Sequence, residues 1–74
     1  MVITVKLFAF FREGRFKEEK RAYPDNATVA DVIRSLDIDR NEVGVTMINS
    51  RHCQLDATPA HGDTVAIFPV IGGG

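Results

Sequence analysis

The sequence has one cysteine, Cys53, two histidines and no tryptophan. A single cysteine excludes an internal disulfide and fits a reducing compartment. Neither His52, which adjoins the cysteine, nor His61 has the further ligands that a metal site needs, or a third group that would orient a catalytic Cys–His pair. We therefore expect no metal site, and we interpret Cys53 as a small buried strand residue rather than a reactive thiol.

Long hydrophobic runs and surplus charge are missing as well. No apolar stretch approaches the length of a membrane span, and the N-terminal residues lack the pattern of a signal peptide. The formal net charge is −1 and no basic stripe is present, which argues against nucleic acid as a partner. We expect a cytoplasmic protein that contacts neither membranes nor nucleic acid, with its 74 residues in one domain.

The chain also lacks the signatures of a stand-alone enzyme. It has no phosphate-binding glycine loop, no metal cluster and no nucleophile–base pair. A domain of this size is too small to enclose much of a substrate pocket. We expect a protein that is not itself an enzyme and that works through its partners.

The hydrophobic pattern predicts five strands and one short helix. The helix has Thr28 as N-cap, and Asp31 three residues on makes a variant of the capping box. Its apolar residues follow the helical spacing and form one stripe, which must pack on a sheet: Val29, Val32, Ile33 and Leu36. The predicted strands cover residues 2–11, 18–23, 43–48, 52–55 and 64–69.

The order of these elements predicts an α+β fold of the β-grasp (ubiquitin-like) type, which is a mixed β-sheet with one short crossover helix. In this arrangement the last strand pairs beside the first at the middle of the sheet. Phe8 and Phe68 would then share the sheet face away from the helix, with Phe10 beside them. The many charges of residues 18–23 are typical of a sheet edge.

The C-terminal end combines a strand with a glycine run. Pro69 lacks an amide donor, so regular ladder pairing should end there. We therefore divide the chain into a domain over residues 1–69 and a flexible tail over residues 70–74, which reaches at most about 17 Å when extended. Gly72, Gly73 and Gly74 have no side chains, so this tail can enter a channel that is too narrow for other residues.

Several segments, taken in order, resemble one family. They are Leu7-Phe8-Ala9, Arg12-Glu13, residues 27–31, Leu55-Asp56, Gly62-Asp63, residues 65–69 and the final Gly73-Gly74. Together they make the chain similar to the ubiquitin-like sulfur carriers, namely the small subunit of molybdopterin synthase and the thiamine sulfur carrier. The strand before the tail and the two glycines carry most of this resemblance.

The resemblance implies chemistry at the terminal carboxylate of Gly74. This group is ionised at neutral pH, given its reference pKa of about 3.3–3.7, and is therefore a poor electrophile. In the family, a partner similar to ubiquitin-activating enzymes uses ATP and magnesium to adenylate the last glycine, and a sulfur donor then displaces AMP to leave a thiocarboxylate. The carrier binds no cofactor itself. It delivers the sulfur to an acceptor enzyme such as a molybdopterin synthase large subunit.

The resemblance also implies a partner-binding surface at the base of the tail. Phe8 and Phe68 match aromatic contact positions of the family, and Phe10 and Pro69 adjoin them. The alternative is that these aromatics pack under a loop or cap the small core. Arg12 could pair with an acidic residue of a partner, although we expect a solvated turn charge.

Features of two family branches are mixed in this chain. Val70 stands where the molybdopterin branch commonly has a second proline, His52 stands where that branch has an apolar contact, and the triple glycine is closer to the thiamine branch. We favour sulfur donation to molybdopterin or the tungsten cofactor over thiamine synthesis or another thiolation pathway. Two further alternatives are a non-covalent ubiquitin-like interaction module and a protein that is conjugated to lysines.

Overall fold

A computed structural model describes residues 1–70 of the chain. Its elements are β1 (Val2–Leu7), the 3₁₀ helix η1 (Ala9–Arg12), β2 (Glu18–Ala22), α1 (Val29–Ser35), the 3₁₀ helix η2 (Arg40–Glu42), β3 (Val43–Ile48), β4 (Arg51–His52) and β5 (Thr64–Pro69). None of the helices in this part of the chain is long and apolar enough to cross a membrane.

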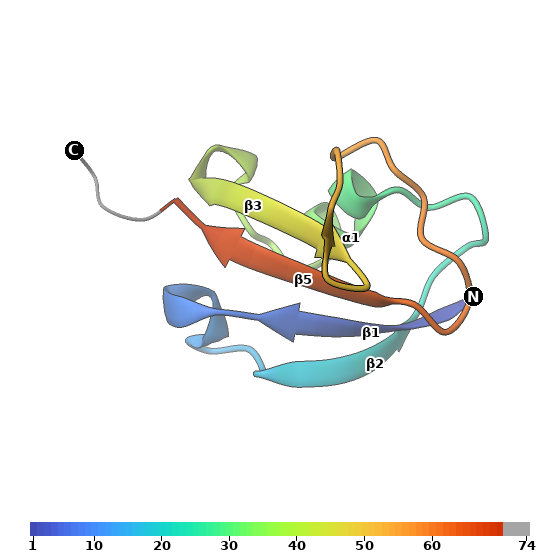
Figure 1. Cartoon of the computed structure of the whole chain (residues 1–74). Coiled ribbons are helices and arrows are strands. Elements are labelled where there is room, and N and C mark those ends of the chain that lie inside the picture. The colour runs from blue at the N-terminus through green and yellow to red at the C-terminus, as the bar shows by residue number, and fades with distance from the viewer. Residues whose placement is uncertain (71–74) are drawn as a thin grey trace.

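The five strands form one sheet in the order β2-β1-β5-β3-β4 (Figure 1). The last strand, β5, lies at the centre, parallel to β1 and antiparallel to β3. The charged strand β2 is an edge strand, as its composition predicts. This topology confirms the predicted β-grasp fold.

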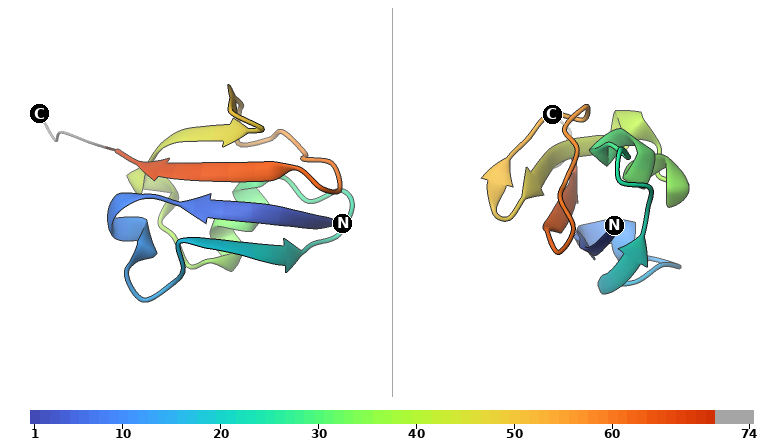
Figure 2. Two further views of the ribbon diagram at one scale, coloured as in Figure 1. Left: turned by 60° about the horizontal axis from the view of Figure 1, so that its bottom comes forward. Right: turned by 90° about the vertical axis from the view of Figure 1, so that its right-hand side faces the viewer.

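The core lies between α1 and one face of the sheet. In the left view of Figure 2 the strands lie in front and α1 lies behind them. The predicted capping box is present, since the Thr28 side chain accepts from the Asp31 amide and the Asp31 carboxylate accepts from the Thr28 amide. The apolar stripe of the helix is buried, together with alternate residues of β1 and β5: Val29, Val32, Ile33, Leu36, Ile3, Val5, Leu7, Val65 and Ile67.

The first strand is shorter than the sequence predicts. It ends at Leu7 instead of residue 11, because Ala9 takes a left-handed conformation with φ of 53° and the chain turns into η1. The Arg12 Nε atom donates to the Leu7 carbonyl oxygen over 2.6 Å and so closes this turn. As a result Phe11 enters the core, where only 2% of its surface is exposed.

The fourth strand was also predicted in the wrong place. β4 contains only Arg51 and His52, because Asn49 and Ser50 both have positive φ and make a two-residue hairpin turn. Cys53 therefore lies just after the strand and is half-buried, packed against the core, rather than fully buried within a strand.

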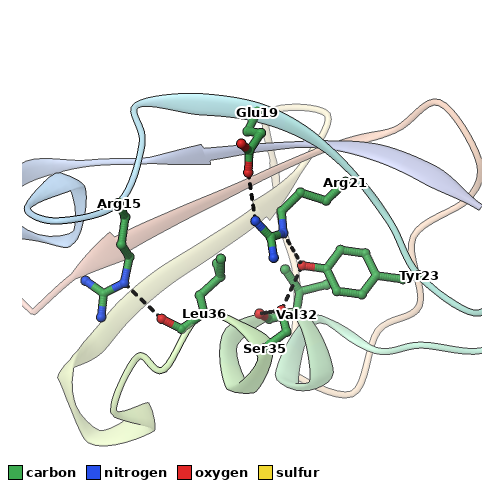
Figure 3. A network of polar contacts seen from close by, with 7 residues as sticks. All are labelled: Arg15, Glu19, Arg21, Tyr23, Val32, Ser35 and Leu36. Atoms are coloured by element: carbon green, nitrogen blue, oxygen red, sulfur yellow. Dashed lines mark hydrogen bonds and ion pairs between the residues drawn. The ribbon is translucent and has the colours of Figure 1, made fainter.

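Side-chain hydrogen bonds close the open side of the core between β2 and α1 (Figure 3). Arg21 Nε donates to the Tyr23 hydroxyl, which shares a hydrogen bond of 2.8 Å with the Ser35 hydroxyl of the helix. Arg15 donates to the Leu36 carbonyl oxygen at the end of α1. These side-chain contacts attach α1 to the edge strand β2 and to the turn that precedes β2.

Candidate functional site

The candidate site begins with a pair of aromatic rings at the C-terminal ends of β1 and β5. Leu7 and Ile67 are paired in the parallel ladder, and both side chains are buried under α1. Because side chains alternate along a strand, the next residues, Phe8 and Phe68, lie on the opposite face. Their rings stack with centroids 4.1 Å apart and an interplanar angle of 11°. Both rings are half-buried, and their predicted placement on the face away from the helix is confirmed.

Arg12 contacts this aromatic pair. Its guanidinium carbon lies 5.2 Å from the centroid of the Phe8 ring, and its Nε atom donates to the Leu7 carbonyl oxygen. A cation over an aromatic ring is stabilised by the ring's quadrupole. Arg12 is exposed, as expected for a solvated turn residue. It also contacts the Phe8 ring, which the sequence did not predict.

Phe10 occupies a different position from the one predicted. It lies on η1 instead of on a strand, and 44% of its surface is exposed. Its ring meets the buried Phe11 ring edge-on, with centroids 5.0 Å apart. Figure 1 shows η1, the element that carries Phe10, at the same end of the sheet as the end of β5.

A shallow apolar hollow continues the site across β5 to β3. Its lining consists of Gly44, Val45, Met47, His52, Phe68, Pro69 and Val70. Val70 is 56% exposed, and His52 at the rim contributes the one ionisable side chain of this lining. Sequence reasoning did not find Val45 and Met47, because on this strand the polar Thr46 is buried and its two apolar neighbours face outward, the reverse of the usual alternation.

The carboxyl groups with perturbed pKa values lie outside this surface. A hydrogen bond from the terminal ammonium of Met1 lowers the pKa of Asp25. Backbone amides do the same for two others: the Thr28 amide lowers the pKa of Asp31, and the Ala60 amide lowers that of Asp63. All three shifts reflect folding contacts. Residues 1–70 contain no cluster of acidic, histidine or cysteine side chains that could hold a metal ion.

The terminal carboxylate of Gly74, which is the predicted reactive group, lies outside the residues that the structure describes. Gly72, Gly73 and Gly74 lie outside the described residues, as does most of the predicted tail over residues 70–74. The roles assigned to them and the boundary between residues 69 and 70 therefore stay predictions. Pro69, which was predicted to contact partners, is itself buried at the end of β5 and also lines the hollow.

A mixed sheet with a central last strand and one crossover helix defines the ubiquitin-like class of small domains. The model of the ThiS family matches residues 5–74, which is nearly the whole chain, so the chain belongs to the ThiS family. This match confirms the resemblance to ubiquitin-like sulfur carriers.

Solved structures share this fold. SAMP1 from Haloferax volcanii is 24% identical, with a TM-score of 0.76 and coverage of 100% of both chains. A putative molybdopterin converting factor subunit 1 from Pyrococcus furiosus is 26% identical, with a TM-score of 0.76 over 96% of this chain and 99% of that one. A third structure, a complex of subunits 1 and 2 of molybdopterin-converting factor from Helicobacter pylori, matches at 17% identity and a TM-score of 0.67, with 100% of both chains covered. None of the curated proteins searched matches this sequence.

Proposed function

We propose that this protein is a sulfur carrier whose last glycine, Gly74, is converted to a thiocarboxylate and donates sulfur in cofactor biosynthesis. The observation that carries the proposal is the ThiS family match, which runs through β5 and the glycines to residue 74. The apolar surface around Phe68 supports the proposal, because that surface includes Pro69 and Val70, the last residues that the structure describes.

The proposed reaction occurs at the terminal carboxylate in two steps. A partner enzyme first joins the Gly74 carboxylate to the AMP moiety of ATP, with magnesium, and pyrophosphate leaves. A sulfur donor at the oxidation level of sulfide then attacks the acyl carbon, and AMP leaves with the electrons of the broken C–O bond. The carrier supplies no acid, base or metal to these steps, so it is a protein substrate and subunit rather than an enzyme.

The proposed partners are an adenylating enzyme similar to ubiquitin-activating enzymes and a sulfur-acceptor enzyme. The Helicobacter pylori structure is a complex of subunits 1 and 2 of molybdopterin-converting factor, and the Pyrococcus furiosus protein is a putative subunit 1 of such a factor. The likeness to these two proteins favours a molybdopterin synthase large subunit as the acceptor, and molybdopterin or the tungsten cofactor as the product. We propose that Phe8, Phe68 and the hollow of β3 form the surface to which both partners dock in turn.

The test is conversion of the purified protein. The full chain is incubated with a candidate activating enzyme, ATP, magnesium and a sulfur source, and its intact mass is measured. We expect the exchange of one oxygen for one sulfur, located on the C-terminal peptide by fragmentation. A mass that stays unchanged with every activating enzyme encoded beside sulfur-carrier genes in related genomes would contradict the proposal.

Two alternatives are separated by simple variants. Gly74→Ala should impair a sulfur carrier, whereas a non-covalent interaction module would not respond to it. Conjugation to lysines would use the same activated glycine, and it would appear as adducts of higher mass in cell extracts. Thiamine synthesis as the pathway would appear as capture of a thiazole-forming enzyme instead of a molybdopterin synthase large subunit.

A further inference from the structure

The ladder between β3 and β5 contains one irregularity, which lies beside the functional surface. Val45 pairs with Phe68, but Val43 pairs with Pro69, so Gly44 is an extra residue on β3. Such a β-bulge changes which face the following residues occupy. Val43 packs against the core, whereas Val45, two residues later, lines the outward hollow.

The shifted register carries the pairing beyond the end of β5. The Val70 amide donates to the Glu42 carbonyl oxygen over 2.8 Å, in the register of the Val43–Pro69 pair. The strand ends at Pro69, as predicted, but this bond continues the pairing by one residue, contrary to the expectation that it would stop there. The backbone of Val70 is therefore attached to the residue that precedes β3.

This arrangement requires that residue 44 has no side chain. A Cβ atom on Gly44 would lie 2.9 Å from the Pro69 carbonyl oxygen and 3.0 Å from the N and Cα atoms of Val70. These are backbone atoms, so they cannot rotate away as a side chain would. Gly44 is not among the glycines with positive φ, so the requirement is for space rather than for an unusual backbone conformation.

We propose that Gly44 is a positioning residue, which sets the point and the direction at which the chain leaves the sheet at Val70. This inference depends on the proposed function. While the hollow is docked on the activating enzyme, the bond to Glu42 would hold the Val70 backbone, four residues before Gly74, in one position relative to that enzyme. Figure 1 shows the start of β3 beside the end of β5, where this contact lies.

The proposal requires the backbone amide of Val70, which donates the hydrogen bond to Glu42. Proline has no amide hydrogen, so a proline at this position could not make the bond to Glu42. Val70 has an amide hydrogen and therefore makes this bond. Val70→Pro removes the hydrogen bond without adding an atom at Gly44.

The main test uses Gly44→Ala in the full chain. NMR detects the bond directly, as scalar coupling between the Val70 nitrogen and the Glu42 carbonyl carbon, and we expect that coupling to disappear. With a cognate activating enzyme, measured by ATP–pyrophosphate exchange, we expect kcat to fall about tenfold or more, since small misplacements of a reacting group are costly. We expect KM to change less than about threefold, because the added methyl group lies against the backbone of Pro69 and Val70 and the other side chains of the docking surface are kept.

The matched control is Met47→Ala, which removes apolar surface from the same hollow and leaves Gly44 and Val70 unchanged. It should show the opposite pattern, with a raised KM and an unchanged kcat. If Gly44→Ala does not fold, Val70→Pro replaces it, and we again expect a lower kcat at a nearly constant KM. A wild-type kcat in the folded variant, or a coupling that persists in Gly44→Ala, would overturn the proposal. If no enzyme activates the wild-type protein, that result would count against the sulfur-carrier function instead. The coupling measurement would still show whether Gly44 is needed for the hydrogen bond between Val70 and Glu42.

Discussion

The two ends of the central strand β5 differ in what holds them. At its beginning, the Thr64 amide donates to the Asn49 side chain, and the Asp63 carboxylate accepts from both the Asn49 side chain and the Ala60 amide. At its other end the side-chain contacts are apolar, with the Phe68 ring stacked on that of Phe8, the residue after β1, and an open hollow beside it.

The same contrast extends to the strand beside it. Near the beginning of β5, the Val2 amide donates to His61 Nδ1, and the Met1 ammonium lies 2.8 Å from the Asp25 carboxylate. Polar groups at this end satisfy one another and leave little to offer a partner. Apolar groups at the other end remain partly exposed, which in a small domain is typical of an interaction surface. One end of the sheet is therefore closed by its own polar contacts, and the other end leaves apolar side chains partly exposed.

The largest expected effect comes from changing the last residue. Deletion of Gly74 should abolish activation while the midpoint of thermal unfolding stays constant, because the last core residue is Ile67 and the last strand ends at Pro69. Activation is measured by ATP–pyrophosphate exchange, and unfolding by circular dichroism. Retention of full activity by the deleted or a C-terminally tagged protein would contradict the prediction.

The next effect concerns the apolar end of β5. Phe68→Ala should weaken binding to the acceptor or activating enzyme by about 2 kcal/mol, roughly thirtyfold in Kd, because aromatic anchors dominate such interfaces. Loss of ring stacking should lower the free energy of unfolding by only about 1 kcal/mol. Isothermal titration calorimetry and urea denaturation measure the two quantities.

The control for this variant lies at the polar end. Asn49→Ala removes two hydrogen bonds, each of which contributes about 1 kcal/mol to stability, and should leave Kd unchanged. Equal loss of binding in both variants would show that the two ends of β5 do not divide stability and recognition between them.

The sequence could predict the elements whose pattern is local. Thr28 and Asp31 specify the start of the helix by their own hydrogen bonds, and the two-residue alternation of β5 identifies its buried face. Phe8 and Phe68 could be paired as soon as the parallel arrangement of the strands was known. These predictions depend on short-range chemistry and one topological rule.

The features that were missed depend on contacts that residue propensities and alternation do not reveal. Ala9 adopts a left-handed conformation, which its own propensity disfavours, and the Arg12 bond to the end of β1 stabilises the turn. The bulge at Gly44 breaks the alternation on β3, so the faces of Val43 and Val45 could not be assigned by counting residues. The hollow was missed for the same reason.

A smaller effect should appear at acidic pH. The pKa of Asp63 is lowered, chiefly by the hydrogen bond from the Ala60 amide, from a reference value of 3.8. A carboxyl group whose pKa is lower in the folded state stabilises the fold above its unfolded pKa and loses this contribution as the pH falls through the folded value. Asp25 and Asp31 act in the same direction. Stability should therefore decline below about pH 4.

The pH prediction is checked by urea denaturation across the acidic range. Asp63→Asn should flatten the decline, because the substituted residue does not titrate. The control is Asp56→Asn, since the Asp56 side chain makes no hydrogen bond among the described residues and should leave the profile unchanged. A profile for Asp63→Asn that is parallel to that of the wild type would show that the polar end does not depend on this charge.

The smallest expected effects come from substitutions in two turns, one at each end of the sheet. Ser50 in the hairpin between β3 and β4 has φ of 67°, and Ala9 near the aromatic pair has φ of 53°. Glycine adopts this conformation without steric cost, so Ser50→Gly and Ala9→Gly should each raise the free energy of unfolding by up to about 1 kcal/mol. Ser50→Gly should leave partner Kd unchanged, whereas Ala9→Gly loosens the residue after Phe8 and should weaken binding slightly. Equal Kd values for the two variants would mean that Phe68 and Arg12 alone hold the Phe8 ring in place. The left-handed turn at Ala9 would then make no contribution.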